Sequence, residues 1–260
     1  MQLDIFQVDA FTHQLFSGNP AAVIPLKNWL PDKVLQNIAA ENNLSETAYF
    51  IKSDDSYHLR WFTPTTEVDL CGHATLATAH VLWQHLGFFE NEISFHSRSG
   101  LLGVKKDGDF YTLNFPTDKL EQIPTPEPIL RAMNIEPIGT WKGREDYLIL
   151  VENQAVVKNL QPDFRILGQL EARGIIVTAQ GIEADFVSRC FFPYFGIDED
   201  PVTGSAHTTL TPFWAKRLGK NELTAHQISK RGGLLKCHFK GNRTDISGQA
   251  ITYLKGSIEI

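Results

Sequence analysis

The chain has 260 residues, of which 42% are hydrophobic, and a formal net charge of −6 at pH 7. This length gives room for two ordinary domains, and an acidic balance without a run of Lys or Arg disfavours nucleic acid and membrane surfaces as partners. Three cysteines are too few for a disulfide framework. The N-terminus lacks the basic and apolar regions of a signal peptide. We therefore expect a cytoplasmic protein.

The chain predicts a mixed succession of strands and helices. Apolar periodicity and turn signals predict, in chain order, strands at 3–11 and 19–26, a helix at 31–42, strands at 47–52 and 57–62, a loop at 63–72, a helix at 74–86, and strands at 92–96, 100–105 and 110–115. The helix at 74–86 is apolar almost all round, which is typical of a buried helix. The second half of the chain is expected to repeat this order.

Two segments of the chain, 72–103 and 204–235, are similar without a gap. Identical residues at matched positions include Gly72 and Gly204, Gly87 and Gly219, Glu90 and Glu222, and Gly100 and Gly232. With small changes in spacing, the sequence after Arg60 also matches that after Arg189, and 19–23 matches 153–157. Chance similarity between two amphipathic helices would explain the apolar periodicity but not the matched glycines. The duplication predicts two similar domains, with a small-molecule site in the cleft between them.

The domain boundaries follow from composition. The segment 116–128, rich in Pro, Glu and Gln, is the predicted linker, so the domains are expected at 1–117 and 118–260. Residues 248–260 have no counterpart in the first half. They are predicted to form a strand, which either crosses back to the first domain or extends the second, and the sequence leaves both alternatives open.

Gly72 and Gly204 lie where the two matched helices are predicted to begin. Glycine lets a backbone approach a ligand closely, and the exposed N–H groups of a first helical turn favour an anion. Two such helix ends directed at one cleft would suit a carboxylate. The lysine of a phosphate-binding loop is missing. For either loop by itself, an ordinary turn is the alternative.

Three positions differ between the matched halves in a way that points to chemistry. Glu46 is an acid at a strand end, whereas the corresponding stretch at 174–177 has none. His73 is replaced by Ser205, and Asp200 lacks a clear counterpart. Each has a structural alternative, since Glu46 could be an exposed strand end, Asp200 a turn residue and His73 a packed helix residue. Their common place at the predicted cleft favours a functional set.

Six short motifs resemble those of the phenazine-biosynthesis PhzF-like family. They lie at Asp9–Thr12, Phe16–Ala22, Leu44–Ala48, Arg60–Pro64, Cys71–Thr75 and Glu199–His207, and together they span nearly the whole chain. The resemblance implies an α+β fold of the diaminopimelate-epimerase type, with two pseudo-symmetric domains, each a curved and mostly antiparallel sheet or barrel around a central helix. It further implies a homodimer and an isomerase that needs no cofactor. The characterised phenazine enzyme moves a proton on a dihydro-hydroxyanthranilic acid.

The resemblance also implies roles for particular residues. Glu46 matches the family's catalytic glutamate, and His73, Asp200 and Ser205 match the groups that support it. A small carboxylic acid is the expected substrate, and the residues expected to bind it are Asn19, Ser45, Gly72, Gly204 and Ser205. No metal is expected.

Several alternatives remain at this level. A two-base epimerase would use Cys71, but the corresponding region offers only Thr203, which is far too weak a base. A zinc site made of Cys71, His73 and His80 fits no standard ligand spacing. A binding protein that lost the reaction would not need Glu46, so its presence favours an enzyme.

Overall fold

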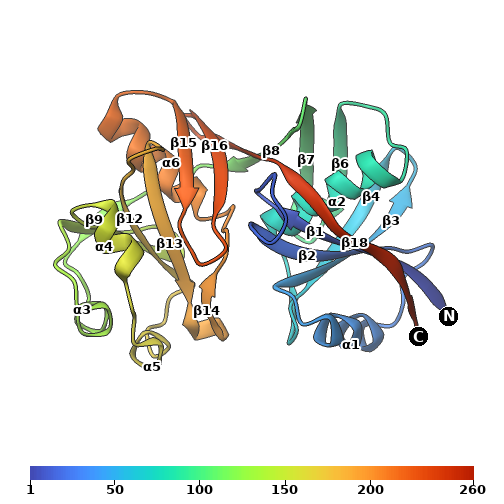
Figure 1. The fold of residues 1–260 in the computed structure, drawn as a ribbon, viewed down its shortest axis with the longest axis horizontal. Coiled ribbons are helices and arrows are strands. Elements are labelled where there is room, and N and C mark those ends of the chain that lie inside the picture. Colours follow the sequence, from blue (N-terminus) through green and yellow to red (C-terminus); the bar gives the residue numbers. More distant parts are fainter. The chain divides into compact units, whose positions relative to one another are not determined.

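The chain divides into two units, one formed by residues 1–114 with 247–260 and the other by 115–246. The computed structural model describes residues 1–260. Each unit is a set of strands around one central helix (Figure 1). None of the helices is both long and apolar enough to cross a membrane.

The first unit contains eleven labelled elements. They are β1 (Gln2–Ala10), β2 (Asn19–Pro25), α1 (Asp32–Asn42), β3 (Glu46–Ser53), β4 (Ser56–Phe62), β5 (Glu67–Val68), α2 (Gly72–His85), β6 (Glu92–Ser97), β7 (Gly100–Asp107), β8 (Phe110–Pro116) and β18 (Ala250–Glu259). The pairs β1–β2, β3–β4 and β6–β7 are antiparallel, whereas β2–β3 and β4–β6 are parallel. All the elements predicted for this half are present, and β5 is an additional short strand in the predicted loop.

Helix α2 is the centre of the first unit. Every residue from Gly72 to Trp83 is buried, as its uniformly apolar surface predicts. The helix ends at His85, and Gly87 then takes a φ of 71°, a conformation that glycine adopts without steric cost. A second apolar cluster between α1 and the sheet includes Leu35, Ile38 and Tyr49. The central helix is therefore held on all sides, so its N-terminal residues have fixed positions.

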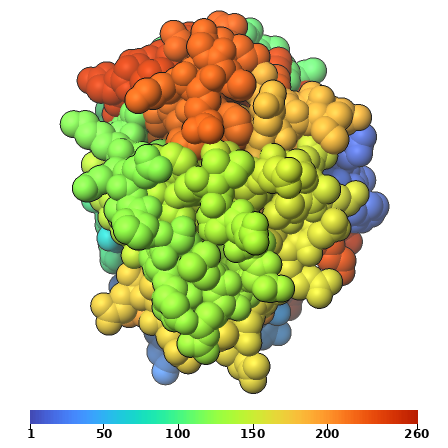
Figure 2. Space-filling model, turned by 90° about the vertical axis from the view of Figure 1, so that its left-hand side faces the viewer, coloured from blue at the N-terminus to red at the C-terminus, as the bar shows by residue number.

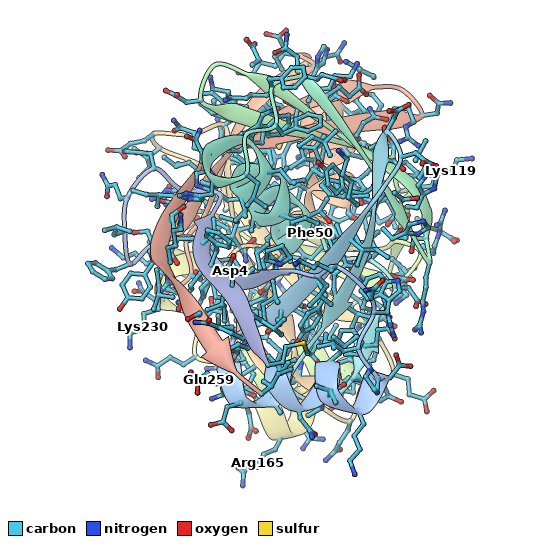
Figure 3. The ribbon with its side chains drawn as sticks, turned by 90° about the vertical axis from the view of Figure 1, so that its right-hand side faces the viewer. Asp4, Phe50, Lys119, Arg165, Lys230 and Glu259 are labelled. Carbon is cyan, nitrogen blue, oxygen red and sulfur yellow. The ribbon has the colours of Figure 1, made fainter.

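The last strand, β18, belongs to the first unit. It pairs antiparallel with β1 from Gln2 opposite Glu259 to Ala10 opposite Ala250, so both ends of the chain lie side by side (Figure 1). Figure 3 shows Asp4 and Glu259 on these neighbouring strands. The pairing satisfies backbone groups of β1 that would otherwise form an open sheet edge. Of the two alternatives for 248–260, the structure thus has the strand that returns to the first half.

The second unit repeats the order of the first. Its elements are β9 (Glu121–Ile123), α3 (Glu127–Met133), β10 (Gly139–Lys142), β11 (Asp146–Leu150), α4 (Gln154–Asn159), α5 (Phe164–Leu167), β12 (Gly174–Gln180), β13 (Phe186–Phe192), the 3-10 helix η1 (Pro193–Phe195), β14 (Ile197–Asp200), α6 (His207–Leu218), β15 (Glu222–Gln227), β16 (Gly233–Lys240) and β17 (Arg243–Gly248). The pairs β10–β11 and β12–β13 are antiparallel, and β11–β12 and β13–β15 are parallel. Two short helices, α4 and α5, replace α1.

The predicted linker at 116–128 is wrong in its central part. Residues of β9 pair antiparallel with β10, and α3 begins at Glu127. Strand β9 therefore pairs with β10 as β18 pairs with β1. An extended segment gains backbone hydrogen bonds in this position that a free linker would lack. In the space-filling view of Figure 2, the green to yellow part of the chain, which includes β9, α3 and α4, forms one face of this unit.

Two further details of the predicted repeat need correction. Asn19 begins a strand, but its supposed counterpart Asn153 caps helix α4, because its side chain accepts a hydrogen bond from the N–H of Val156 at 3.1 Å. Helix α6 begins at His207 rather than Gly204, and the intervening residues form a turn closed by the His207 N–H on the Gly204 carbonyl at 3.0 Å.

Strand register shows which positions of the two units correspond. Glu46 is the first residue of β3 and lies opposite Ala21 in the parallel pair with β2. Gly174 is the first residue of β12 and lies opposite Asp146 in the matching pair with β11. Glu46 therefore corresponds to Gly174, as the sequence alignment predicts.

The same comparison assigns a counterpart to Asp200. Val68 lies opposite Trp61 in the β4–β5 pair, and Asp200 lies opposite Cys190 in the β13–β14 pair. Asp200 therefore takes the place that Val68 has in the first unit, so the second unit carries an acid where the first carries an apolar residue.

Candidate active site

The first unit brings Glu46 and His73 together. Glu46 opens β3 and has a side chain 13% exposed, and His73 is the buried second residue of α2. Oε2 of Glu46 lies 3.0 Å from Nε2 of His73, although the two atoms are not aligned as a good hydrogen bond. Catalytic hydrogen bonds are often loose before a substrate binds. This separation allows a proton to pass between the carboxylate and the ring.

The other nitrogen of the His73 ring has two neighbours. Nδ2 of Asn19 lies 3.2 Å from Nδ1, and Sγ of Cys71 lies 3.5 Å from it. When the ring is neutral, an amide N–H of Asn19 directed at Nδ1 makes that nitrogen the acceptor, which places the ring N–H on Nε2, facing Glu46. Asn19, the first residue of β2, thus orients the histidine.

The charges around His73 favour its protonated form. Burial by itself lowers the pKa of His73, but the neighbouring Cys71 and Glu46 oppose it, so the pKa lies well above the usual value. Burial raises the pKa of the Cys71 thiol, and the negative charge of Glu46 raises it further. Because a thiol with a raised pKa stays protonated, we assign the effect on His73 to the Glu46 carboxylate. Cys71 is therefore a poor base in this setting.

The same residues offer donor atoms for a metal ion. Glu46, Cys71 and His73 each have one donor atom within 4.8 Å of the others. Their arrangement does not suit a single ion, because Cys71 approaches Nδ1 of the ring whereas Glu46 approaches Nε2. His80 is not part of this group. Its ring contacts the Tyr111 hydroxyl at 3.0 Å and the Thr252 hydroxyl at 2.9 Å, so both nitrogens have partners elsewhere.

The second unit holds Asp200 on a tightly hydrogen-bonded loop. The hydroxyl of Thr203 donates to the Asp200 carboxylate. The buried amide of Gln227 accepts from the Thr203 N–H at 2.8 Å and donates to the Asp200 carbonyl at 2.7 Å. These contacts hold the Asp200 carboxylate next to the turn at Gly204. They also occupy the hydroxyl of Thr203, the residue that corresponds to Cys71.

Ser205, on the same turn, contacts a charged pair. Nη1 of Arg173 donates to the Ser205 hydroxyl oxygen at 3.1 Å, and Nε donates to the Asp146 carboxylate at 2.9 Å. Asp146 is 2% exposed, and Glu145 lies 3.1 Å from the same guanidinium. Burial alone would lower the pKa of Arg173, but these carboxylates raise it. The guanidinium therefore keeps its charge.

The remaining predicted site residues have simpler surroundings. Ser45 is half-buried and immediately precedes β3, and Gly72 is the buried first residue of α2. The first-turn N–H groups of a helix lack acceptors within that helix. Gly204 is buried in the turn before α6. The ligand-binding roles of these residues stay predictions.

Two residues of the candidate site, Gln227 and Arg173, are not among those predicted from the sequence. Gln227 is a polar residue on the buried side of an alternating strand, after Leu223 and Ala225, and this break in the pattern was the available signal. Arg173 precedes β12 as Ser45 precedes β3. Its position could have been found from the aligned halves, but its partner Asp146 lies too far away in the sequence to be inferred.

The fold is shared with a protein of low sequence identity. A probable proline racemase of Agrobacterium radiobacter superposes with a TM-score of 0.65 over 99% of this chain and 92% of that chain, at 10% identity. The predicted α+β fold of the epimerase type is confirmed.

Sequence similarity identifies the family. Residues 8–256 match the family described as phenazine biosynthesis-like protein. An uncharacterized isomerase of Pseudomonas aeruginosa is 50% identical over 260 residues, which cover all of both chains. The crystal structure of a PhzF-family phenazine biosynthesis protein of Enterococcus faecalis superposes with a TM-score of 0.97 over all of both chains, at 47% identity. The chain belongs to the phenazine biosynthesis-like (PhzF) family, and its prediction as an isomerase is confirmed.

Proposed function

We propose that the protein moves a proton between two carbon atoms of a small carboxylic acid without a cofactor, with Glu46 as the acid/base. The observation that carries this proposal is the 3.0 Å approach of Glu46 to His73 at a position where the duplicated unit has Gly174. A scaffold that folds equally with glycine there does not need the acid for its structure. The acid is therefore best explained by chemistry.

The proposed reaction is a balanced proton shift. The Glu46 carboxylate takes a proton from a C–H bond of the substrate, and the electron pair of that bond moves into the adjacent unsaturated system. Glu46 then returns the proton to a different carbon, so the product is an isomer and nothing is oxidised or reduced. A single positioned carboxylate is a common general acid/base. His73 would hold the carboxylate in place, and Asp200 would stabilise the second proton position.

The proposal includes binding of the substrate carboxylate by Ser45 and by the N-terminal turns at Gly72 and Gly204. This part rests on the duplicated sequence, which predicts a site made by both halves of the chain. Backbone N–H groups at a helix start are suitable donors to a carboxylate and to charge that develops in the transition state.

Two features of the site disfavour the two-base epimerase. The pKa of the Cys71 thiol is raised by burial, and the Thr203 hydroxyl at the corresponding position already donates to Asp200. Neither residue offers the second base that such a mechanism needs.

Proton exchange with solvent tests the proposed function. Unsaturated ring acids, beginning with a dihydro-hydroxyanthranilic acid, would be incubated in D2O and followed by proton NMR for deuterium at carbon and for isomer formation. We expect turnover by the wild type and by Glu41→Gln, an exposed control, and a rate at least about a hundredfold lower for Glu46→Gln. Turnover by Glu46→Gln near the wild-type rate would refute the role of Glu46.

A further inference from the structure

The second unit has no room for an acid at the position of Glu46. A Cβ atom on Gly174 would lie 2.3 Å from Cε1 of Phe192 and 3.0 Å from Oδ1 of Asp146. The space that a side chain would use is occupied by the aromatic ring and by the carboxylate that binds Arg173. The second unit has thus replaced the acid by a fixed ion pair.

Arg173 is held from several sides. Two of its nitrogens bond to Asp146, Glu145 lies 3.1 Å away, and the guanidinium carbon is 5.7 Å from the centre of the Phe192 ring. The side chain is 31% exposed. With its other donors engaged, Nη1 is directed at Ser205.

The contact with Arg173 determines what the Ser205 hydroxyl can do. A hydroxyl group has one donor and can accept from others, and the Oγ atom of Ser205 accepts from Nη1 at 3.1 Å. Arginine has no acceptor atom, so the hydroxyl proton must be donated elsewhere. A hydrogen bond from a charged donor also polarises the hydroxyl and strengthens it as a donor.

We propose that Arg173 is a positioning residue that commits Ser205 to donate its hydroxyl proton to the carboxylate of the substrate. The proposal rests on the proposed function, since it takes a small carboxylic acid as the ligand. A carboxylate oxygen only accepts hydrogen bonds, so it matches a hydroxyl whose proton still needs an acceptor. The neutral amide of the same shape offers one acceptor oxygen instead of two and no charge.

Benzoate and benzamide, which share size and shape, are suitable probes because no substrate turnover is needed. Their dissociation constants would be measured by ligand-observed NMR titration for the wild type, Ser205→Ala and Arg173→Lys, with Arg165→Lys as a control, because Arg165 is a surface residue paired only with Asp163. We expect the wild type and the control to bind benzoate at least fivefold more tightly than benzamide. Ser205→Ala and Arg173→Lys should each weaken benzoate about tenfold and change benzamide less than threefold.

A double-mutant cycle distinguishes positioning from an independent contact. If Arg173 acts through Ser205, the variant with both substitutions should bind benzoate no more weakly than Ser205→Ala alone. Because a lone Arg173 substitution can leave Asp146 unpaired, Arg173→Met combined with Asp146→Asn provides a second test, and its binding should match that of Ser205→Ala. Circular dichroism would verify the fold of each variant.

Additive losses, unchanged benzoate binding in both Arg173 variants, or a wild type that binds the two probes equally or not at all would overturn the inference. Glu46→Gln should bind benzoate like the wild type. Failure of the proposed proton shift would therefore appear in the exchange experiment without altering these dissociation constants.

Discussion

The two units use one scaffold for opposite kinds of charge. At the start of β3, Glu46 faces His73, a side chain that can take up and release a proton. At the start of β12, Gly174 leaves space for Asp146 and Arg173, and a guanidinium does not release its proton in proteins. A pair that can exchange a proton therefore stands in the first unit, and a pair of fixed charge stands at the corresponding place in the second.

Both units retain an Arg–Glu pair that has a structural role. Arg60 bonds through Nε and Nη2 to both oxygens of Glu67 at 2.7 and 2.8 Å, and Arg189 bonds in the same way to Glu199 at 2.6 and 2.8 Å. Bidentate pairs of this kind fix geometry as well as adding energy. They tie β4 to β5 and β13 to β14, so they hold the segment that leads into each central helix. The shared pairs build the scaffold, and the differing pairs are the candidates for function.

The largest effects are expected when one functional group is removed from each unit in turn. On an acid that the wild type turns over, Glu46→Gln should lower kcat about a hundredfold with little change in KM, because the amide keeps size and hydrogen bonding but cannot accept the proton. Ser205→Ala should instead raise KM about tenfold and leave kcat nearly unchanged. Steady-state kinetics would check both. The reverse pattern would exchange the roles assigned to the two units.

A fall in pH should lower the stability of both units, because each central helix contains a buried histidine. Burial, together with the charges of His85 and Lys106, lowers the pKa of His80 to about 4, and burial lowers that of His207 to about 4. Their folded-state values lie below the unfolded value of about 6.5. As the pH falls from about 6.5 to 4, the unfolded chain takes up protons that the folded chain excludes, so stability decreases.

Each of these histidines should cost up to about 3 kcal/mol of unfolding free energy across that range, at about 1.36 kcal/mol per pKa unit. Urea unfolding at pH 7 and pH 4 would measure it for the wild type, for His207→Gln, and for His96→Gln, an exposed control. His207→Gln should lose less stability on acidification than the wild type, whereas the control should match the wild type. Equal losses in all three proteins would contradict the assignment to His207.

Adding a methyl group to Gly174 tests why the second unit lacks an acid. We expect Gly174→Ala to lower the unfolding free energy by about 2 kcal/mol, the scale of overpacking in a filled site, because the new Cβ would collide with Phe192 and Asp146. Denaturant unfolding would measure the change. Gly196 has open space but a φ of 79°, so Gly196→Ala separates backbone strain from crowding. Undiminished stability of Gly174→Ala would show that the acid was not excluded by lack of space.

The smallest effect is expected at Cys71. Its thiol is buried with a raised pKa, and no second cysteine corresponds to it in the other unit. Cys71→Ala should therefore keep activity within about threefold of the wild type, and thermal unfolding should show a stability loss of about 1 kcal/mol for the lost buried atoms. Complete loss of activity in a folded variant would revive the two-base epimerase.

Much of the fold could be read from local patterns. Strand β1 and helix α2 were predicted within two residues because their apolar periodicities are long and regular. Strand β9 was missed, since three residues in a Pro-rich stretch carry no periodic signal and become a strand only when β10 offers its edge. The start of α6 was placed three residues early, because glycine marks a turn without stating where helical hydrogen bonding begins.

The family, the fold class and the asymmetric positions Glu46, His73 and Asp200 follow from the sequence, because these are properties of residue identity and spacing. Which side chains meet depends on the folded chain. The 3.0 Å approach of Glu46 to His73 and the contact of Arg173 with Asp146 and Ser205 join residues far apart in the chain. Such contacts depend on strand register and on the space that each packed unit leaves, and neither quantity is written in a local pattern.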